Sequence, residues 1–419
     1  NNQNSSSTFF KTLHTTTAEA LADTAWYNDG GTWTNRLAIT IQDNAVSVDL
    51  NDFPVYLDLS QIPSSHTFWT GVKSGGEDIR ITLADGVSEV PVEIVDIDTS
   101  GKTGEVYFKL PQLTATQETT VYVYYGNSSA TEPAAGDAAG RNSVWSEYVF
   151  VHHLQGANRA SLIDSTGNGH VFSSEGGSSV YESSGKLSSG DGIDFNGSDN
   201  YIAITDHDDL SPWGALNSQD AQLSFSVWAK PDDAISAQYL VTKGGSDNWE
   251  YGIYVQNEDL VSIAWQSGGG DHIVDQPNND NLTQGAWQLY YFTLDYRTEL
   301  SSTLGTLRSY VDSTASFSDS PDLGGMTNGT ADLELGARGS GGYYFDGTLD
   351  EFRLTQQLRT SDWVSTEYNN QSTPESFYTV GTEESGGVPS SGPGKRKAIM
   401  ISKDQPRDTS RAHNKFFDL

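Results

Sequence analysis

The chain has 419 residues, no cysteine and a formal net charge of −33 at pH 7. This length suits two or three domains of ordinary size, and the lack of cysteine excludes disulfides and thiol chemistry. The charge argues against nucleic acid as a partner, because phosphate binding needs basic patches. It fits either solubility in a salty setting or carboxylates that serve as calcium ligands.

Residues 1–25 are rich in Asn, Ser and Thr, and we interpret them as a polar leader or spacer. They lack the basic-then-apolar pattern of an export signal, so we expect the mature part of a secreted, extracellular or cell-surface protein. No run of 18 apolar residues follows. We therefore expect no membrane insertion.

Residues 26–130 predict a first β-sandwich. Apolar and polar residues alternate in short segments, as where Val55 and Leu57 alternate with Tyr56 and Asp58. This period of two turns one face of each strand inward and the other outward. Turn residues separate the segments at the short spacing that is typical of sandwiches and barrels.

The rest of the chain predicts a second and larger sandwich. Small and polar residues at 131–144 predict a linker, and residues 145–384 repeat the strand pattern, with one expected helix at Ser361–Asn369. Residues 385–419 form a Gly/Pro/Ser-rich linker and a basic tail. The sequence thus predicts an all-β fold, with two jelly-roll-type β-sandwich domains in tandem and flexible termini.

The second sandwich resembles the LamG-like jelly-roll family of concanavalin A-like lectins and glucanases. Five pieces follow one another in that family's order, namely D-S-T-G-N-G at 164–169, G-I-D-F-N-G-S-D-N-Y-I at 192–202, L-S-F-S-V-W-A-K-P at 223–231, G-T-L-D-E-F-R-L at 347–354, and the segment 363–381. The resemblance implies a lectin-type sandwich.

The first sandwich resembles a domain of unknown function in secreted bacterial and archaeal proteins, which often precedes a LamG-like domain. The matching pieces are W-T-N-R-L-A-I at 33–39, F-P-V at 53–55, E-D-I-R at 77–80 and Y-V-Y-Y-G-N at 122–127. This resemblance implies no particular chemistry.

The LamG-like resemblance implies a structural calcium where the early turn meets the closing strand. Carried over to this chain, its ligands are Asp164, Asn168 and Asp350, with Glu351 as a further candidate. Carboxylate and amide oxygens are the ligands that calcium prefers. The alternative is that Asp164 only caps its turn and Asp350 only pairs with Arg353.

A sugar site needs flat aromatic faces beside polar groups. Trp249 follows Asp247 and Asn248, and Tyr343 and Tyr344 follow a glycine-rich turn. We expect these five residues to bind the ligand. The alternative is that the rings pack in the protein core.

The sequence does not support catalysis. It has no E-x-D-x-E strand of the related glucanases, no G-x-S-x-G elbow and no H-E-x-x-H helix. His152 and His153 are neighbours, which on a strand point to opposite faces, so we expect no joint metal site from the pair.

We therefore expect a non-catalytic, secreted or surface binding or adhesion protein that recognises glycan or another extracellular polymer. The alternative is a structural subunit of an extracellular fibre, pilus or surface layer. Such a subunit would self-associate through edge strands or through a terminal segment such as Lys397–Ser402. A glycoside hydrolase is a third and weaker interpretation.

Overall fold

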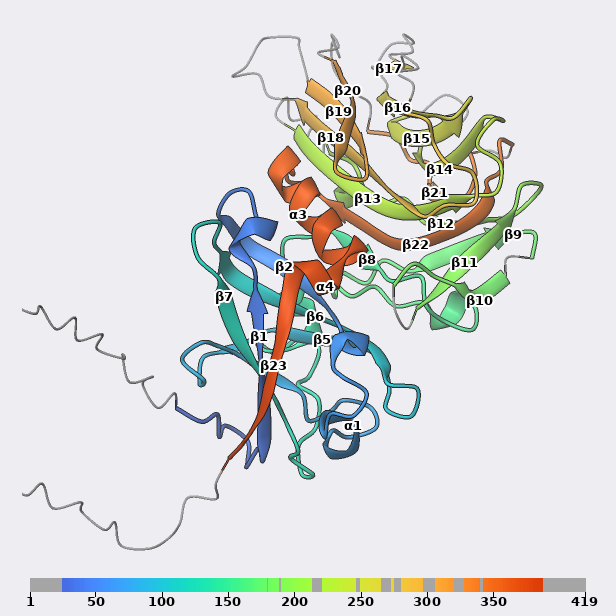
Figure 1. The fold of residues 1–419 in the computed structure, drawn as a ribbon. Helices are drawn as coiled ribbons and strands as arrows, with labels where there is room; N and C mark the ends of the chain where they lie inside the picture. The colour runs from blue at the N-terminus through green and yellow to red at the C-terminus, as the bar shows by residue number, and fades with distance from the viewer. Residues whose placement is uncertain are drawn as a thin grey trace, which may run out of the picture. The chain divides into compact units, whose positions relative to one another are not determined.

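The computed structural model has two β-sandwiches in tandem, as the sequence predicts (Figure 1). The described residues are 25–178, 180–187, 190–212, 221–245, 249–264, 273–274, 280–296, 306–319, 328–339 and 342–386. The leader and the basic tail fall outside these ranges.

The first sandwich packs a five-stranded sheet against a three-stranded one. In spatial order the larger sheet contains β23 (Tyr378–Ser385), β1 (Asn35–Ile41), β7 (Thr119–Tyr125), β3 (Arg80–Leu83) and β4 (Glu89–Val90). The smaller sheet contains β2 (Leu50–Asp58), β6 (Thr103–Leu113) and β5 (Val92–Asp98). Apolar side chains from the inner faces of both sheets form one core.

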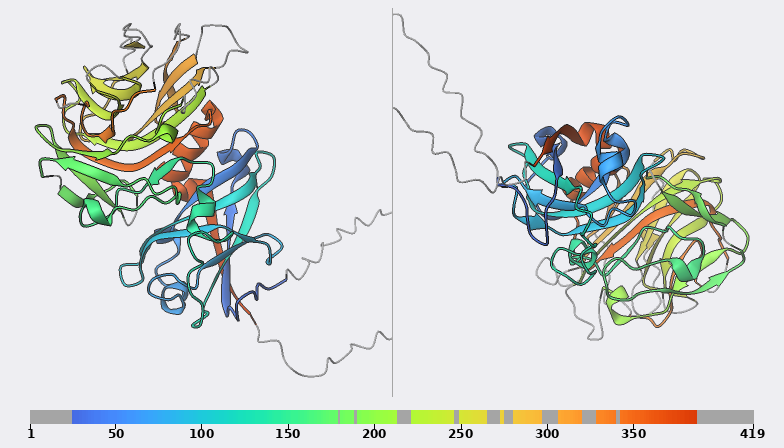
Figure 2. Two further views of the ribbon diagram at one scale, coloured as in Figure 1. Left: turned by 180° about the vertical axis from the view of Figure 1, so that it is seen from behind. Right: turned by 90° about the horizontal axis from the view of Figure 1, so that it is seen from below.

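Strand β23 lies beside β1, although it comes from the far end of the sequence (Figures 1 and 2). We expected residues 145–384 to form the second sandwich throughout. The structure instead places this final strand in the first sandwich, where Asn35 pairs with Ser385 and Ile41 pairs with Tyr378. The chain therefore connects the two sandwiches twice, once through the segment between them and once where it returns from the second sandwich to form β23.

The second sandwich packs two larger sheets against each other. Among the described residues, one sheet contains β10 (Val180–Ser184), β11 (Asp191–Asn196), β22 (Asp346–Thr355), β13 (Ala221–Pro231), β18 (Gln288–Tyr296), β19 (Thr306–Val311) and β20 (Thr314–Asp319), while β8 (Phe150–His152) also pairs with β22. The other contains β17 (Ile273–Val274), β16 (Asp259–Ala264), β15 (Tyr251–Gln256), β14 (Gln238–Lys243), β21 (Leu333–Leu335), β12 (Tyr201–Ile204) and β9 (Phe172–Gly176). Their inner faces share a separate apolar core.

Helices are few and short within the described chain. The expected helix is α3, which the Thr360 side chain caps by accepting a hydrogen bond from the Trp363 N–H. It runs three residues further than predicted. The helices are α1 (Phe68–Gly71), α2 (Arg141–Val144), α3 (Ser361–Ser372) and α4 (Pro374–Phe377), with single 3₁₀ turns η1 (Asp43–Ala45), η2 (Leu59–Gln61), η3 (Arg159–Ser161) and η4 (Asp208–Leu210).

The segment predicted as a linker, 131–144, is fixed along the first sandwich. The Arg80 guanidinium donates to the Thr131 carbonyl at 2.6 Å, and the Val92 N–H donates to the Ala139 carbonyl at 3.0 Å. These contacts make the segment a bound surface loop that ends in α2.

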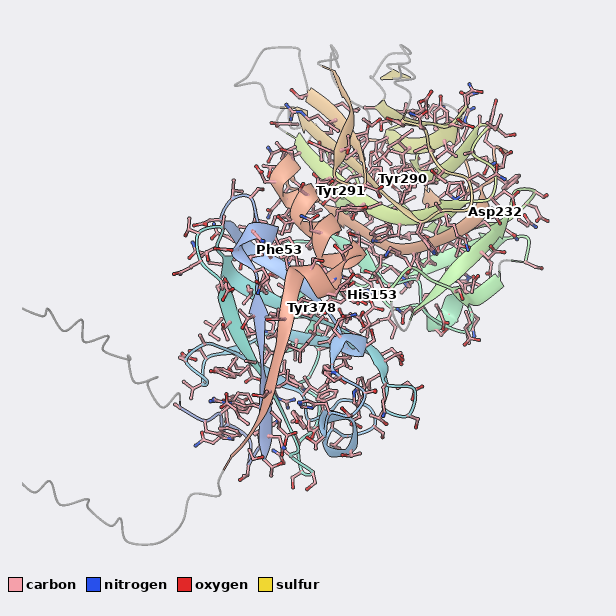
Figure 3. All side chains as sticks on the ribbon, viewed as in Figure 1. Phe53, His153, Asp232, Tyr290, Tyr291 and Tyr378 are labelled. Atoms are coloured by element: carbon pink, nitrogen blue, oxygen red, sulfur yellow. The ribbon has the colours of Figure 1, made fainter. Side chains whose placement is uncertain are left out.

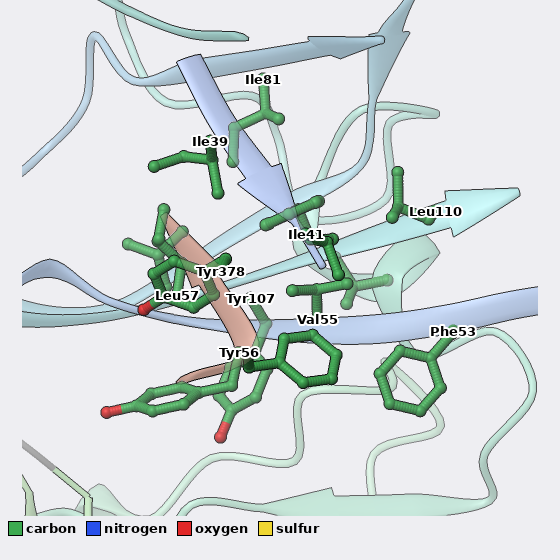
Figure 4. Packing of buried hydrophobic residues seen from close by; sticks show 14 of the residues in the cluster. Ile39, Ile41, Phe53, Val55, Tyr56, Leu57, Ile81, Tyr107, Leu110 and Tyr378 are labelled. Carbon is green, nitrogen blue, oxygen red and sulfur yellow. The ribbon is translucent and has the colours of Figure 1, made fainter. Parts of the chain in front are cut away.

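Strand β2 is buried on both faces. Val55 and Leu57 face the core of the first sandwich, as expected, but Tyr56 and Asp58 are also buried. Figure 4 shows Tyr56 beside Tyr107 and Tyr378. The outer face of β2 is covered because α3 packs on it, and Asn370 of α3 bonds the Tyr56 backbone at both its N–H and its carbonyl.

A buried ionic network joins the two sandwiches. The Arg353 guanidinium of β22 lies 2.6 Å from the Glu351 carboxylate and 3.2 Å from the Glu367 carboxylate of α3. It also donates to the Tyr107 hydroxyl of β6 at 2.8 Å. Arg353 is 1% exposed, so β22, α3 and the first sandwich meet at one desolvated charge.

His153 extends this network, and Figure 3 shows it between the two sandwiches. Its ring nitrogens lie 2.5 Å from Glu351 and 3.2 Å from Glu93 of β5. Burial alone would lower the pKa of His153, but the two carboxylates raise it well above its usual value. A cationic His153 therefore links carboxylates of both sandwiches.

A β-bulge in β22 sets up these contacts. Ser226 of β13 pairs with Arg353 and Trp228 pairs with Asp350, so Val227 faces both Glu351 and Phe352. Glu351 has a φ of 54°, in the left-handed region. The extra residue lets Leu349 and Phe352, which are three apart, both enter the apolar core, and Glu351 and Arg353 then project outward together on either side of Phe352.

Replacing Arg353 by methionine should cost about 3–5 kcal/mol of unfolding free energy, because it leaves the buried Glu367 carboxylate without its cation and Glu351 with His153 alone. Urea denaturation measures this. The matched control is Arg159→Met in the partly exposed pair with Glu175, 3.5 Å away, where we expect a loss of at most about 1 kcal/mol. Equal losses in the two variants would contradict the role of the network.

Candidate functional site

Two of the five residues predicted to bind ligand come together on the outer face of the seven-stranded sheet. Trp249 lies just before β15, and Tyr343 lies in the loop before β22. Tyr344 is partly buried, and no ring contact joins it to the others among the described residues. Asp247 and Asn248 lie outside the described residues.

Trp249 and Tyr343 meet around one guanidinium. The Arg338 guanidinium carbon lies 4.6 Å from the ring centroid of Trp249, 5.2 Å from that of Tyr343 and 5.9 Å from that of Tyr239. Tyr239 in turn stacks on Tyr254 of the next strand, with centroids 4.7 Å apart. We call these five residues the aromatic face.

The aromatic face combines a rigid base with an exposed edge. Tyr239 and Tyr254 are at most 9% exposed and belong to a small apolar cluster with Val261 and Ile263. Tyr343 is 51% exposed, and its carbonyl accepts a hydrogen bond from the Tyr239 N–H at 2.9 Å. The rings nearest to solvent are thus held by rings that are packed on the sheet.

The backbone brings the loops of Trp249 and Arg338 together. Gly339 and Gly244 approach so closely that a Cβ atom on Gly339 would lie 2.0 Å from the Gly244 carbonyl oxygen. Next to Trp249, the buried Glu250 accepts a bond from the Lys243 ammonium at 3.0 Å. This close approach and this ion pair fix the positions of both loops.

Beside the aromatic face, a row of residues crosses the same sheet. Cross-strand pairing aligns Ala203, Glu334, Thr242, Gly252 and Ile263 on neighbouring strands. Thr242 is fully buried, and neither its hydroxyl nor the buried Oε2 of Glu334 has a hydrogen-bond partner among the described residues. Burial, followed by the charge of Asp332, raises the pKa of Glu334 to about 7.

The predicted calcium ligands are not assembled as one site. The Asp164 carboxylate accepts bonds from the N–H groups of Thr166, Gly169 and His170 and from the Thr166 hydroxyl, at 2.7–3.1 Å. Asn168 donates its side-chain amide to the Val149 carbonyl. With its lone pairs directed at these donors, Asp164 caps the turn.

Asp350 and Glu351 contact residues other than those of that turn. Asp350 is buried and accepts a bond from the Lys186 N–H at 2.7 Å, and burial and the charge of Glu351 raise its pKa to about 8. Glu351, rather than Asp350, pairs with Arg353. The described carboxylates of Asp164, Asp350 and Glu351 do not converge within metal-ligand distance.

A cavity in the first sandwich is a less suitable candidate. It has a volume of about 530 Å³ and is lined in part by Tyr27, Trp33, Arg80 and Glu89. The Tyr27 hydroxyl donates to Glu89 at 2.6 Å, and the Arg80 guanidinium lies 3.3 Å from the same carboxylate. Tyr27 and Arg80 thus hold Glu89, although its Oε1 accepts no hydrogen bond among the described residues.

Sequence reasoning missed Arg338, Tyr239, Tyr254 and Glu334. The two tyrosines lie in strands with apolar neighbours, and in such strands the sequence predicts that an aromatic side chain packs in the protein core. Arg338 gave a weak signal, as a lone basic residue between glycines in an acidic chain. Glu334 and Arg338 are close in sequence, but both are far along the chain from Tyr239 and Tyr254, and the fold of the sheet brings the two groups together.

Family comparisons agree with both sequence resemblances. Residues 196–365 match the concanavalin A-like lectin/glucanases superfamily. Residues 75–162 match a family described as a domain of unknown function (DUF2341). The chain therefore contains a LamG-like region preceded by this domain. No curated protein sequence matches the chain.

Solved structures that are similar to part of the chain include two toxin binding domains and one domain of an arabinanase. The binding domain of Paraclostridial Mosquitocidal Protein 1 is 15% identical, with a TM-score of 0.40 over 53% of this chain and 52% of that one. Domain 4 of AbnA, a GH43 extracellular arabinanase from Geobacillus stearothermophilus in complex with arabinotriose, is 19% identical, with a TM-score of 0.37 over 53% and 98%. The receptor binding domain of botulinum neurotoxin C/D mosaic serotype is 12% identical, with a TM-score of 0.41 over 55% and 52%.

The chain thus spans about half the length of the toxin domains that it matches. No helix in the described part of the chain is long and apolar enough to cross a lipid bilayer.

Replacing Glu334 by glutamine should raise stability above pH 7 and leave it unchanged near about pH 4. The folded carboxyl titrates near 7 instead of 4.5, so the parent protein loses stability as the pH rises between these values. After allowance for solvent screening we expect a gain of about 1–2 kcal/mol in thermal or urea unfolding. The exposed Glu118→Gln serves as the control, and a gain independent of pH would contradict the assignment.

Proposed function

We propose that this chain, with its LamG-like region behind a domain of unknown function, is a non-catalytic extracellular binding protein. It would recognise glycan or another polymer through the aromatic face. The observation that supports this most directly is the Arg338 guanidinium set among the rings of Trp249, Tyr343 and Tyr239, at 4.6–5.9 Å.

This arrangement suits carbohydrate chemistry. A sugar ring presents C–H groups on one face, which pack on aromatic rings, and hydroxyls around its edge, which need hydrogen-bond partners. Trp249 and Tyr343 supply ring surface, and a guanidinium such as that of Arg338 supplies N–H donors in a fixed plane. Glu334, whose side chain is partly exposed, adds a carboxyl on the same side of the sheet.

The proposal predicts that Trp249→Ala and Tyr343→Ala each weaken binding at least about tenfold, the equivalent of about 1.4 kcal/mol. A glycan array identifies the ligand, and titration calorimetry measures the variants. The matched control is Trp287→Ala, because Trp287 is also partly buried and has a cation, Lys230, 5.5 Å from its ring. Binding that survives both substitutions, or no binding to any polymer, would refute the proposal. We expect no turnover on a panel of polysaccharides.

The alternative, a structural subunit, has one observation in its favour. β23 is an outer strand of its sheet, and its second edge has no strand partner within the described part of the chain. An open edge can pair with another molecule. Sedimentation velocity over a range of concentrations tests this: we expect a single species for a binding module, whereas concentration-dependent growth would favour the structural role.

A further inference from the structure

Three potential metal ligands converge at one end of the second sandwich. Asp209 Oδ2 lies 3.0 Å from His170 Nε2, and Asp209 Oδ1 lies 2.6 Å from His207 Nδ1. All three ligand atoms lie within 4.8 Å of one another. This cluster shares no residue with the aromatic face or with the predicted calcium ligands.

The strand register produces this convergence. β9 and β12 are antiparallel neighbours, and Phe172 pairs with Ile204. Because the strands run in opposite directions, the residues just before β9 and just after β12 lie at the same end of the pair. His170 comes two residues before Phe172, and His207 comes three residues after Ile204.

The turn that was expected to bind calcium holds one of the ligands. The Asp164 carboxylate accepts the His170 N–H at 3.1 Å, which fixes the backbone that carries the imidazole. His170 is 7% exposed, and its ring packs against Phe150 and His207. The buried imidazole is thus oriented from both its backbone and its ring.

The 3₁₀ turn η4 holds the carboxylate ligand. The Gln356 side-chain amide, just beyond β22, donates to the carbonyls of Asp209 and Ser211 at 2.9 and 3.1 Å. Ligands that are braced by such outer contacts keep their orientation and bind metal more tightly.

We propose that His170, His207 and Asp209 bind one divalent transition-metal ion such as Zn²⁺. Two imidazole nitrogens and a carboxylate form a donor set that suits zinc, whereas calcium prefers oxygen ligands throughout. Three protein ligands leave a tetrahedral position for water or for a group of a bound partner. The His207 side chain is 62% exposed, so an ion can enter from solvent.

The ion would connect three segments that are far apart in sequence. It would tie the turn that ends at His170 to η4, and through Gln356 it would tie η4 to the end of β22. Without an ion, the same distances describe one carboxylate that is hydrogen-bonded to two imidazoles. A metal site and a hydrogen-bonded cluster are distinguished by whether added metal ions bind there.

The test uses the full chain without a histidine tag, freed of metal by chelation. We expect one equivalent of Zn²⁺ to bind and to raise the melting temperature, since an ion that binds only the folded state stabilises it. We expect Co²⁺ to bind at the same site and to give visible absorption bands that report its coordination geometry. Calcium should produce neither effect.

His207→Ala and Asp209→Asn should each lower zinc affinity at least about tenfold, by analogy with the losses seen when metal-site contacts are removed. The matched control is Asp208→Asn, which changes an exposed neighbouring carboxylate outside the cluster. Both substitutions lie at solvent-accessible positions, so calorimetry of the metal-free proteins should show the parental fold. The proposal fails if zinc does not bind, or if the ligand variants bind it as tightly as Asp208→Asn does.

Discussion

The buried contact between Arg353 and Glu351 is the constraint on which the arrangement of the two sandwiches depends. A charge that is removed from water must find partners, and β22 supplies one partner itself, because Glu351 lies two residues before Arg353 on the same face of the strand. The remaining partners come from α3 and from the first sandwich. Charged partners of this kind fix where the surfaces meet more strictly than apolar contacts do, because a displaced carboxylate would leave the guanidinium unpaired.

This network also determines which surface of the LamG-like sandwich remains available. Trp228 and Tyr291 lie on the outer face of the eight-stranded sheet and belong to the same apolar cluster as the core of the first sandwich. That face is therefore an internal interface. The outer face of the seven-stranded sheet, with Trp249 and Tyr343, is not used in this way. If the proposed function holds, the first domain, whose own chemistry is unassigned, leaves the other side of its neighbour for recognition.

The fold could be predicted because it depends on local patterns. Alternation along the strands and the ordered LamG-like pieces were sufficient for two sandwiches, and Trp249 and Tyr343 were found as aromatic residues beside turns. The errors arose where a residue's environment is set by distant segments. Tyr56 is buried because α3 covers it, and the backbone of Asp58 is bonded by the Tyr378 hydroxyl of the last strand. Glu351 rather than Asp350 is the partner of Arg353, because residues two apart on a strand share a face.

Register explains the other residues that the sequence did not reveal. Arg338 meets Trp249, and His170 meets His207, only because particular strands are neighbours in particular alignments. A single sequence contains no direct record of such pairing. The turn at Asp164 illustrates the limit well: its oxygen-rich sequence suggested a metal ligand, but its hydrogen bonds show that it orients the backbone of its neighbours.

The position of β23, which follows the second sandwich in sequence but pairs with β1 of the first, has a mechanical consequence. Asn35 is paired with Ser385 at one end of the β1–β23 ladder, so opposed pulling at these two residues would open the ladder from that end, one pair at a time. The link between Arg36 and Glu384, at 2.7 Å, lies next to that end and would bear load early. Peeling of β23 would then transmit tension to α4 and α3. Traction between these two residues would therefore act first on the first sandwich, since β1 and β23 both belong to it.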